Sequence, residues 1–187
     1  DQAVRIERIL MPDDYRPHLG ASNAKELVFD LLDSRYEVAT AGSKDTGRSG
    51  TAQYLHGSEI SFWQHAADHM AGLGQAVPDA DGTEILLEST ANGTANVFHE
   101  LWQLAVKGRS EYMPVFIPWF WQDEYRRAIP VGFELSAADE EDYRGAYART
   151  LEQMAWRQRK IDTDFRGDRS LFDQEYPASA ELAFASS

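Results

Sequence analysis

The sequence predicts an α/β fold, because strand and helix character alternate over residues 52–117. Residues 84–88 form a short apolar-centred run, which is typical of a strand. Residues 97–105 then place apolar side chains at helical spacing, and residues 112–117 return to strand character. Strand, polar loop, helix and strand in this order are typical of a parallel sheet. Ligands bind such sheets at the carboxyl ends of the strands, here the loops after His56 and Leu87.

The segments before residue 84 are separated by turn residues. Asp33 and Ser34 favour a tight connection between two apolar stretches, and Gly, Ser and charged residues favour a loop before Gly50. The elements expected there are a helix at 3–10, strands at 26–31 and 35–40, a loop at 42–50, a strand at 52–56 and a helix at 62–73.

The composition changes after Tyr125, and residues 126–187 are predicted to form a helical appendage. Ser136 and Asp139 resemble a capping box at the start of a helix. Apolar and aromatic side chains from Tyr143 to Met154 then form one stripe, which predicts a single long helix ending near Lys160.

Composition excludes several classes of protein. The 187 residues include 18 Lys and Arg against 31 Asp and Glu, a net charge of −13, so this surface alone is not expected to grip a phosphate backbone. The chain has no cysteine, which excludes disulfides, a thiolate zinc site and a Cys nucleophile. No apolar run approaches the roughly 20 residues of a membrane-spanning helix.

Two candidate groups follow the predicted parallel strands. Glu59 can orient an attacking water as a general base, but on position alone a solvated Glu that caps the helix starting near Phe62 is the favoured interpretation. Ser89, Thr90 and Asn92 can offer hydroxyls and an amide to a phosphate. The same residues are also common in turns and helix caps.

Two further features are weaker. Arg48 lies on a Gly-flanked loop and can reach into an anionic site, but such residues are more often simply solvated. His65 and His69 have the i, i+4 spacing of a metal-binding pair, yet no third ligand has motif spacing. A surface pair of histidines is the favoured interpretation, and no residue is assigned as a metal ligand.

Longer stretches, taken in order, resemble motifs of the large subunit of tailed-phage and prophage terminases, the DNA-packaging motors. Residues 47–63, which contain LHGSEI, are similar to the Walker B region of that family. Residues 84–102, which contain LLESTANG, resemble its coupling motif and the helix after it. Residues 112–120 continue the likeness, and residues 172–184, with FDQEYP, resemble the segment before the nuclease domain. The resemblance covers residues 25–187.

This resemblance implies roles for the residues after the strands. Glu59 matches the catalytic carboxylate that positions water against the γ-phosphate of ATP. Ser58 occupies the slot of the Walker B aspartate, next to the nucleotide and Mg²⁺. Ser89 and Thr90 match the coupling motif that senses the γ-phosphate and relays hydrolysis to DNA movement, and Asn92 matches the turn that follows.

Arg48 matches an arginine proposed in some family members as a finger that acts on a neighbouring subunit. Two family features are absent from the sequence: the G-x-x-x-x-G-K-[ST] phosphate loop and the acidic cluster of an RNase H-like nuclease. The family places the first upstream and the second downstream. The chain is therefore expected to be a central portion, with the later part of the ATPase domain at 1–125 and a helical linker subdomain at 126–187.

The implied fold is part of a RecA-like (ASCE) P-loop sheet with a C-terminal helical appendage. The implied parent is an ATPase and endonuclease that uses ATP and Mg²⁺ to drive viral DNA into a procapsid. Its expected partners are double-stranded DNA, the portal protein, the small terminase subunit and neighbouring large subunits in a ring. It would act in the cytoplasm of the bacterial host, transiently at the procapsid portal, without a membrane, and this portion alone would be inactive.

Two alternatives remain open at this point. One is a metal-dependent hydrolase built on Glu59, His65 and His69. The other is a non-catalytic interaction module that keeps only the shape of a nucleotide hydrolase.

Overall fold

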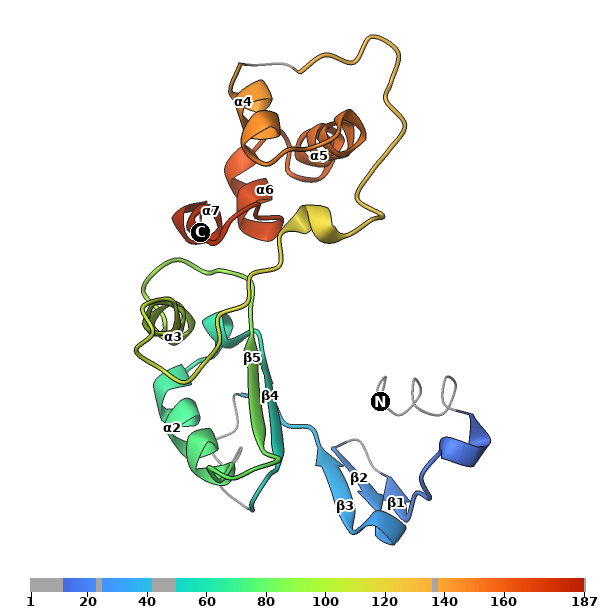
Figure 1. Cartoon of the computed structure of the whole chain (residues 1–187), viewed down its shortest axis with the longest axis vertical. Coiled ribbons are helices and arrows are strands. Elements are labelled where there is room, and N and C mark those ends of the chain that lie inside the picture. The colour runs from blue at the N-terminus through green and yellow to red at the C-terminus, as the bar shows by residue number, and fades with distance from the viewer. Residues whose placement is uncertain (1–11, 23–24, 42–49, 136–137, 187) are drawn as a thin grey trace. The chain divides into compact units, whose positions relative to one another are not determined.

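The structure, a computed structural model, describes residues 12–22, 25–41, 50–135 and 138–186 (Figure 1). The chain divides into two compact units at Gly50, and each unit is described by itself. The helix expected at residues 3–10 and most of the loop expected at 42–50 lie outside the described residues. In the described part, no helix is both long and apolar enough to cross a membrane.

The first unit contains a small antiparallel sheet in the order β1-β2-β3. Its strands are β1 (Ala21–Ser22), β2 (Glu26–Phe29) and β3 (Ser34–Glu37), and Leu27 on β2 is buried. The 3-10 helix η1 (Asp13–Tyr15) precedes β1, and η2 (Asp30–Leu32) connects β2 to β3. The strands expected at 26–31 and 35–40 are both present, at 26–29 and 34–37.

The second unit begins with a parallel pair of strands, β4 (Tyr54–Ser58) and β5 (Glu84–Glu88), in which Tyr54 pairs with Glu84 and Ser58 with Glu88. The chain crosses between them through the 3-10 helix η3 (Ile60–Phe62) and α2 (Ala66–Ala76). Helix α3 (Val97–Val106) follows β5, on the same side of the strands as α2 (Figure 1). The strand and helix expected at 52–56 and 62–73 are thus observed at 54–58 and 66–76, and the strand and helix expected at 84–88 and 97–105 at 84–88 and 97–106.

Gly57 explains how closely this layer packs. A Cβ atom on Gly57 would lie 2.7 Å from Cδ1 of Ile60 and 3.0 Å from Cδ2 of Leu87. Both distances are shorter than an ordinary carbon contact. Only glycine therefore lets buried Ile60 pack directly on β4, and this packing fixes where the chain turns after the strand.

The strand expected at residues 112–117 is wrong. This segment is extended but pairs with no strand in the described part of the chain. Pro114 has no N–H to donate to a ladder, and the side chain of Met113 is 82% exposed. The observed class is mixed α/β with a two-stranded parallel sheet and several helices.

The single long helix expected from Tyr143 to Lys160 is also wrong, because the chain breaks there. It forms α4 (Ala138–Ala146) and α5 (Leu151–Asp164). Ala148 lies at φ 51°, outside helical geometry, and Thr150 starts α5 through a capping box with Gln153. Ser136, expected to begin a capping box, lies outside the described residues.

The rest of the second unit packs around aromatic side chains. Its further elements are η4 (Trp119–Trp121), α6 (Arg169–Glu175) and α7 (Ala180–Ser186). Trp119 and Phe172 are buried in its core, and the ring of Trp156 stacks on that of Trp119 with centroids 5.4 Å apart. Trp119 and Phe120 of η4 thus form a core with aromatic residues of the later helices, whereas Trp121 is exposed.

Candidate functional site

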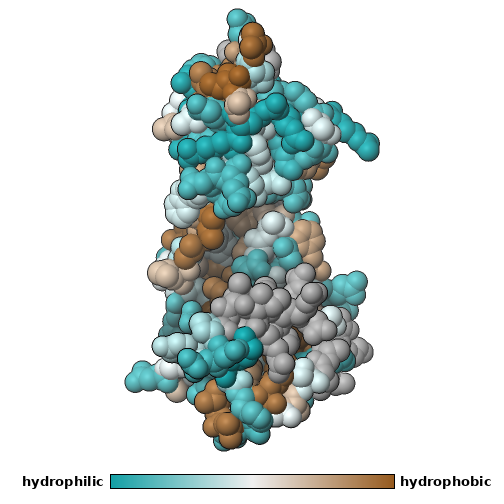
Figure 2. Space-filling model, turned by 90° about the vertical axis from the view of Figure 1, so that its right-hand side faces the viewer, coloured by the Kyte–Doolittle hydropathy of each residue, from teal (hydrophilic) through white to brown (hydrophobic). Residues whose placement is uncertain are grey.

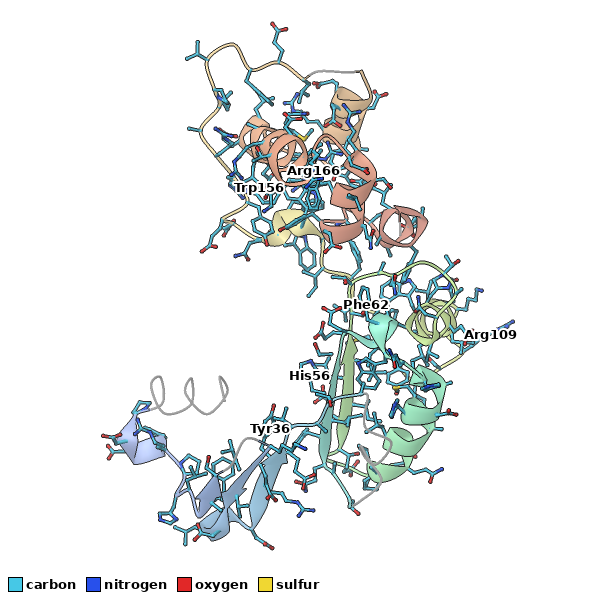
Figure 3. The ribbon with its side chains drawn as sticks, turned by 180° about the vertical axis from the view of Figure 1, so that it is seen from behind. Tyr36, His56, Phe62, Arg109, Trp156 and Arg166 are labelled. Carbon is cyan, nitrogen blue, oxygen red and sulfur yellow. The ribbon has the colours of Figure 1, made fainter. Side chains whose placement is uncertain are left out.

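The carboxyl ends of β4 and β5 lie side by side, since their last residues, Ser58 and Glu88, pair in the ladder. The loops that leave these strands begin together at this edge of the sheet, as expected for a parallel pair. Figure 3 labels His56, midway along β4, and Phe62 on η3, the short helix that follows the end of the strand. Glu59, the first residue beyond β4, has a φ of 57° and is exposed.

The structure brings Glu59 and Thr90 together across 31 positions of sequence. The hydroxyl Oγ1 of Thr90 donates a hydrogen bond to Oε2 of Glu59 over 3.3 Å. Both residues had been singled out from the sequence, and the parallel pairing of their strands explains why they meet. A hydrogen bond from Thr90 occupies one carboxylate oxygen and restricts the rotation of the Glu59 side chain, while the carboxylate remains accessible to water.

Ser89 and Asn92 contact the backbone of Ser61. The Ser61 N–H donates to Oγ of Ser89 over 3.1 Å, and Nδ2 of Asn92 donates to the Ser61 carbonyl over 3.2 Å. We refer to these two bonds as the Ser61 clamp. Ser61 is buried, with 6% of its surface exposed. The sequence analysis missed it, and its only signal was its place two residues after Glu59.

Two other contacts at this edge were also missed. Nε2 of His56 lies 3.6 Å from Oε1 of Glu88, and both side chains are about half exposed. The indole Nε1 of Trp63 donates to the carbonyl of Ser58 over 2.8 Å. The second bond ties η3 to the end of β4, because Trp63 directly follows that short helix. Ser58 itself is exposed at the last position of the strand.

The remaining candidates do not join this group. Arg48 lies outside the described residues, so its expected role stays a prediction. His65 precedes α2 with a φ of 56°, and the ring of His69 meets the edge of Trp63 with centroids 6.2 Å apart. Within the described ranges, no group of three or more His, Asp or Glu side chains is placed to hold a metal ion. No observation therefore favours the hydrolase built on Glu59, His65 and His69.

The side chains of Ser58 and Glu59 end in oxygen atoms, the kind of metal ligand that Mg²⁺ prefers. Mg²⁺ is commonly held by one or two carboxylates together with water and substrate phosphates. The hydroxyl of Ser58 and the carboxylate of Glu59 fit that requirement. Chemically, the arrangement offers an accessible carboxylate at a parallel strand end, oriented by a hydroxyl from the neighbouring loop.

No model of a protein family matches the chain, and no curated protein matches it.

Proposed function

We propose that this chain is the later part of the ATPase domain, with the linker subdomain, of a terminase large subunit. In this proposal the parallel pair β4–β5 belongs to a RecA-like P-loop sheet. The observation that carries the proposal is the contact between Thr90 and Glu59 at the strand ends. The resemblance matches these two residues to the coupling motif and the catalytic carboxylate, and such residues must lie close together to act on one nucleotide.

In the proposed reaction Glu59 orients the water that attacks the γ-phosphate of ATP. A carboxylate in this place polarises the water and accepts its proton. Thr90 holds the carboxylate by its hydroxyl. Ser58 would help to hold Mg²⁺, which would neutralise charge on the phosphates. Arg48 would supply a guanidinium to the nucleotide of a neighbouring subunit.

The parent protein is proposed to move double-stranded DNA into a procapsid and to cut it, in the cytoplasm of a bacterial host. Its partners would be the portal protein, the small terminase subunit and further large subunits in a ring. The net charge of −13 leaves the cations that contact DNA to other parts of the parent. The phosphate loop that cradles ATP would likewise come from outside these 187 residues.

The test is the exchange of Glu59 for Gln in the parent protein. Glu59→Gln keeps the shape of the side chain but removes its ability to accept a proton, so ATP turnover is expected to fall about 10²-fold or more. Fluorescent-nucleotide titration should show unchanged ATP binding.

Glu84→Gln is the matched control, because Glu84 is exposed at the opposite end of β5. It should leave turnover unchanged. Loss of ATP binding in Glu59→Gln, or equal losses of turnover in the two variants, would contradict the proposed role.

A further inference from the structure

We infer that Ser89 and Asn92 are positioning residues, which hold Glu59 in place through the Ser61 clamp rather than by contacting the nucleotide. The inference rests on the proposed function for the reaction, but its geometry stands on the contacts of the chain itself. It divides the loop after β5 into two parts. Thr90 touches the Glu59 carboxylate, whereas Ser89 and Asn92 hold the backbone that carries it.

The first step is the short distance along the chain between Glu59 and the Ser61 clamp. The N–H of Phe62 donates to the carbonyl of Glu59 over 3.0 Å and closes a single turn around Ile60 and Ser61. Ile60 is fully buried and packs against Gly57, and this packing also restrains the turn. Any force that holds the Ser61 backbone therefore restricts the φ and ψ of Glu59.

The second step is the backbone of Glu59, whose φ of 57° is uncommon for a residue with a side chain. Such a conformation is energetically unfavourable and persists only where surrounding contacts impose it. The two bonds of the Ser61 clamp are contacts of this kind, because they engage both backbone polar groups of Ser61. Without them, Glu59 can relax toward ordinary backbone angles and redirect its carboxylate.

The third step is the anchor of the loop itself. Nδ2 of Asn96 donates to the carbonyls of Asn92 and Gly93 over 2.8 and 3.1 Å, and its Oδ1 accepts the N–H of His99. Asn96 thereby caps α3 and holds the turn that carries Asn92. A continuous set of hydrogen bonds runs from the start of α3 through Asn92 and Ser61 to the turn of Glu59.

The closing experiment measures the clamp in the 187-residue chain by NMR. In Ser89→Ala, the amide exchange of Ser61 is expected to accelerate about 2- to 10-fold, since one hydrogen bond is lost. The backbone HN–Hα coupling of Glu59 should change in the same variant. Asn92→Ala, which removes the other bond, should change this coupling too, and the amides of the β4–β5 ladder report whether each variant is folded.

Ser61→Ala is the matched control. It also removes a buried hydroxyl, but the Ser61 Oγ has no hydrogen-bond partner in the described part of the chain, and both clamp bonds use the backbone. The Glu59 coupling should stay unchanged in this variant. An unchanged Glu59 coupling in both Ser89→Ala and Asn92→Ala, with the ladder intact, would overturn the inference.

Kinetics of the parent protein then separate positioning from nucleotide contact. A misplaced catalytic group costs about 10²-fold, so Ser89→Ala should lower kcat on that order and leave ATP affinity unchanged. A loss of ATP affinity with kcat preserved would make Ser89 a nucleotide contact and overturn the inference. If the NMR response occurs but the unaltered parent hydrolyses no ATP, the proposed ATPase function fails and the positioning of Glu59 stands.

Discussion

Glu59 combines an exposed carboxylate with a left-handed backbone conformation. The backbone conformation is held by buried Ile60 and by the Ser61 clamp, while the side chain remains open to water. Strained backbone of this kind is frequent where a side chain must be aimed. Glu59 stands at the N-cap position of η3, but its side chain makes no capping hydrogen bond and instead accepts one from Thr90.

Arg48 is expected to act on the nucleotide of a neighbouring subunit. A guanidinium that reaches the neighbour's nucleotide stabilises charge in the transition state, and such arginines contribute on the order of 10³ or more in rate. Arg48→Ala in the parent should therefore nearly abolish stimulated ATP turnover while the ATP affinity of the monomer changes little.

Mixed rings test whether Arg48 acts across the interface. Arg48→Ala and Glu59→Gln subunits, each inactive alone, are combined, and turnover should recover where an intact Arg48 meets an intact Glu59. Mixed rings that assemble but stay inactive would contradict an action in trans.

At the scale of elements, a buried charge group links α4, α5 and α6. Arg157 on α5 pairs with Glu140 on α4, with both side chains at most 3% exposed, and its Nη2 lies 3.6 Å from Oδ1 of Asp173 on α6. The guanidinium also lies 4.1 Å from the ring centre of Tyr143. Burial raises the pKa of Tyr143 to about 12 and raises the pKa of Asp173. Arg169 on α6 also lies 3.3 Å from Glu140, so buried Arg157 and partly exposed Arg169 together join the three helices.

Arg157→Met is expected to lower the free energy of unfolding by about 3–5 kcal/mol, because it removes the buried partner of Glu140 and leaves that carboxylate only Arg169, whose Nε lies 3.3 Å away. Urea denaturation followed by Trp fluorescence measures the change, since Trp156 lies in this core. Arg159→Met on the exposed side of α5 is the control, expected within about 0.5 kcal/mol of the unaltered chain. Equal effects of the two variants would show that the buried pair does not hold these helices together.

Elements with a strong local pattern were predictable from the sequence. The run at 84–88 was correct to the residue, and the meeting of Glu59 with Thr90 followed from parallel pairing. The break near Ala148 was not predictable from the apolar stripe, because the stripe continues across it while the cap at Thr150 decides the helix start. The clamp on Ser61 depends on contacts 28 and 31 positions apart, which no local pattern reports.

At the scale of the whole molecule, the second unit exposes apolar side chains that additional strands or helices could cover. Met113, Val115 and Ile117 alternate along one unpaired segment and are 82%, 61% and 70% exposed, and Leu86 on β5 is 54% exposed. On the face seen in Figure 2, hydrophobic patches interrupt a hydrophilic surface. A contiguous exposed apolar surface would mark a site of contact with further polypeptide. The exposed side chains agree with the proposal that this sheet is part of a larger one.

DNA-stimulated ATP turnover, measured side by side for the parent protein and for the 187-residue chain, tests the central claim most directly. The account predicts turnover by the parent that rises when double-stranded DNA is added. It predicts negligible turnover by the 187-residue chain, since its sequence holds no phosphate loop to bind the β- and γ-phosphates. A parent that hydrolyses no ATP, or robust turnover by the 187-residue chain that Glu59→Gln abolishes, would contradict it.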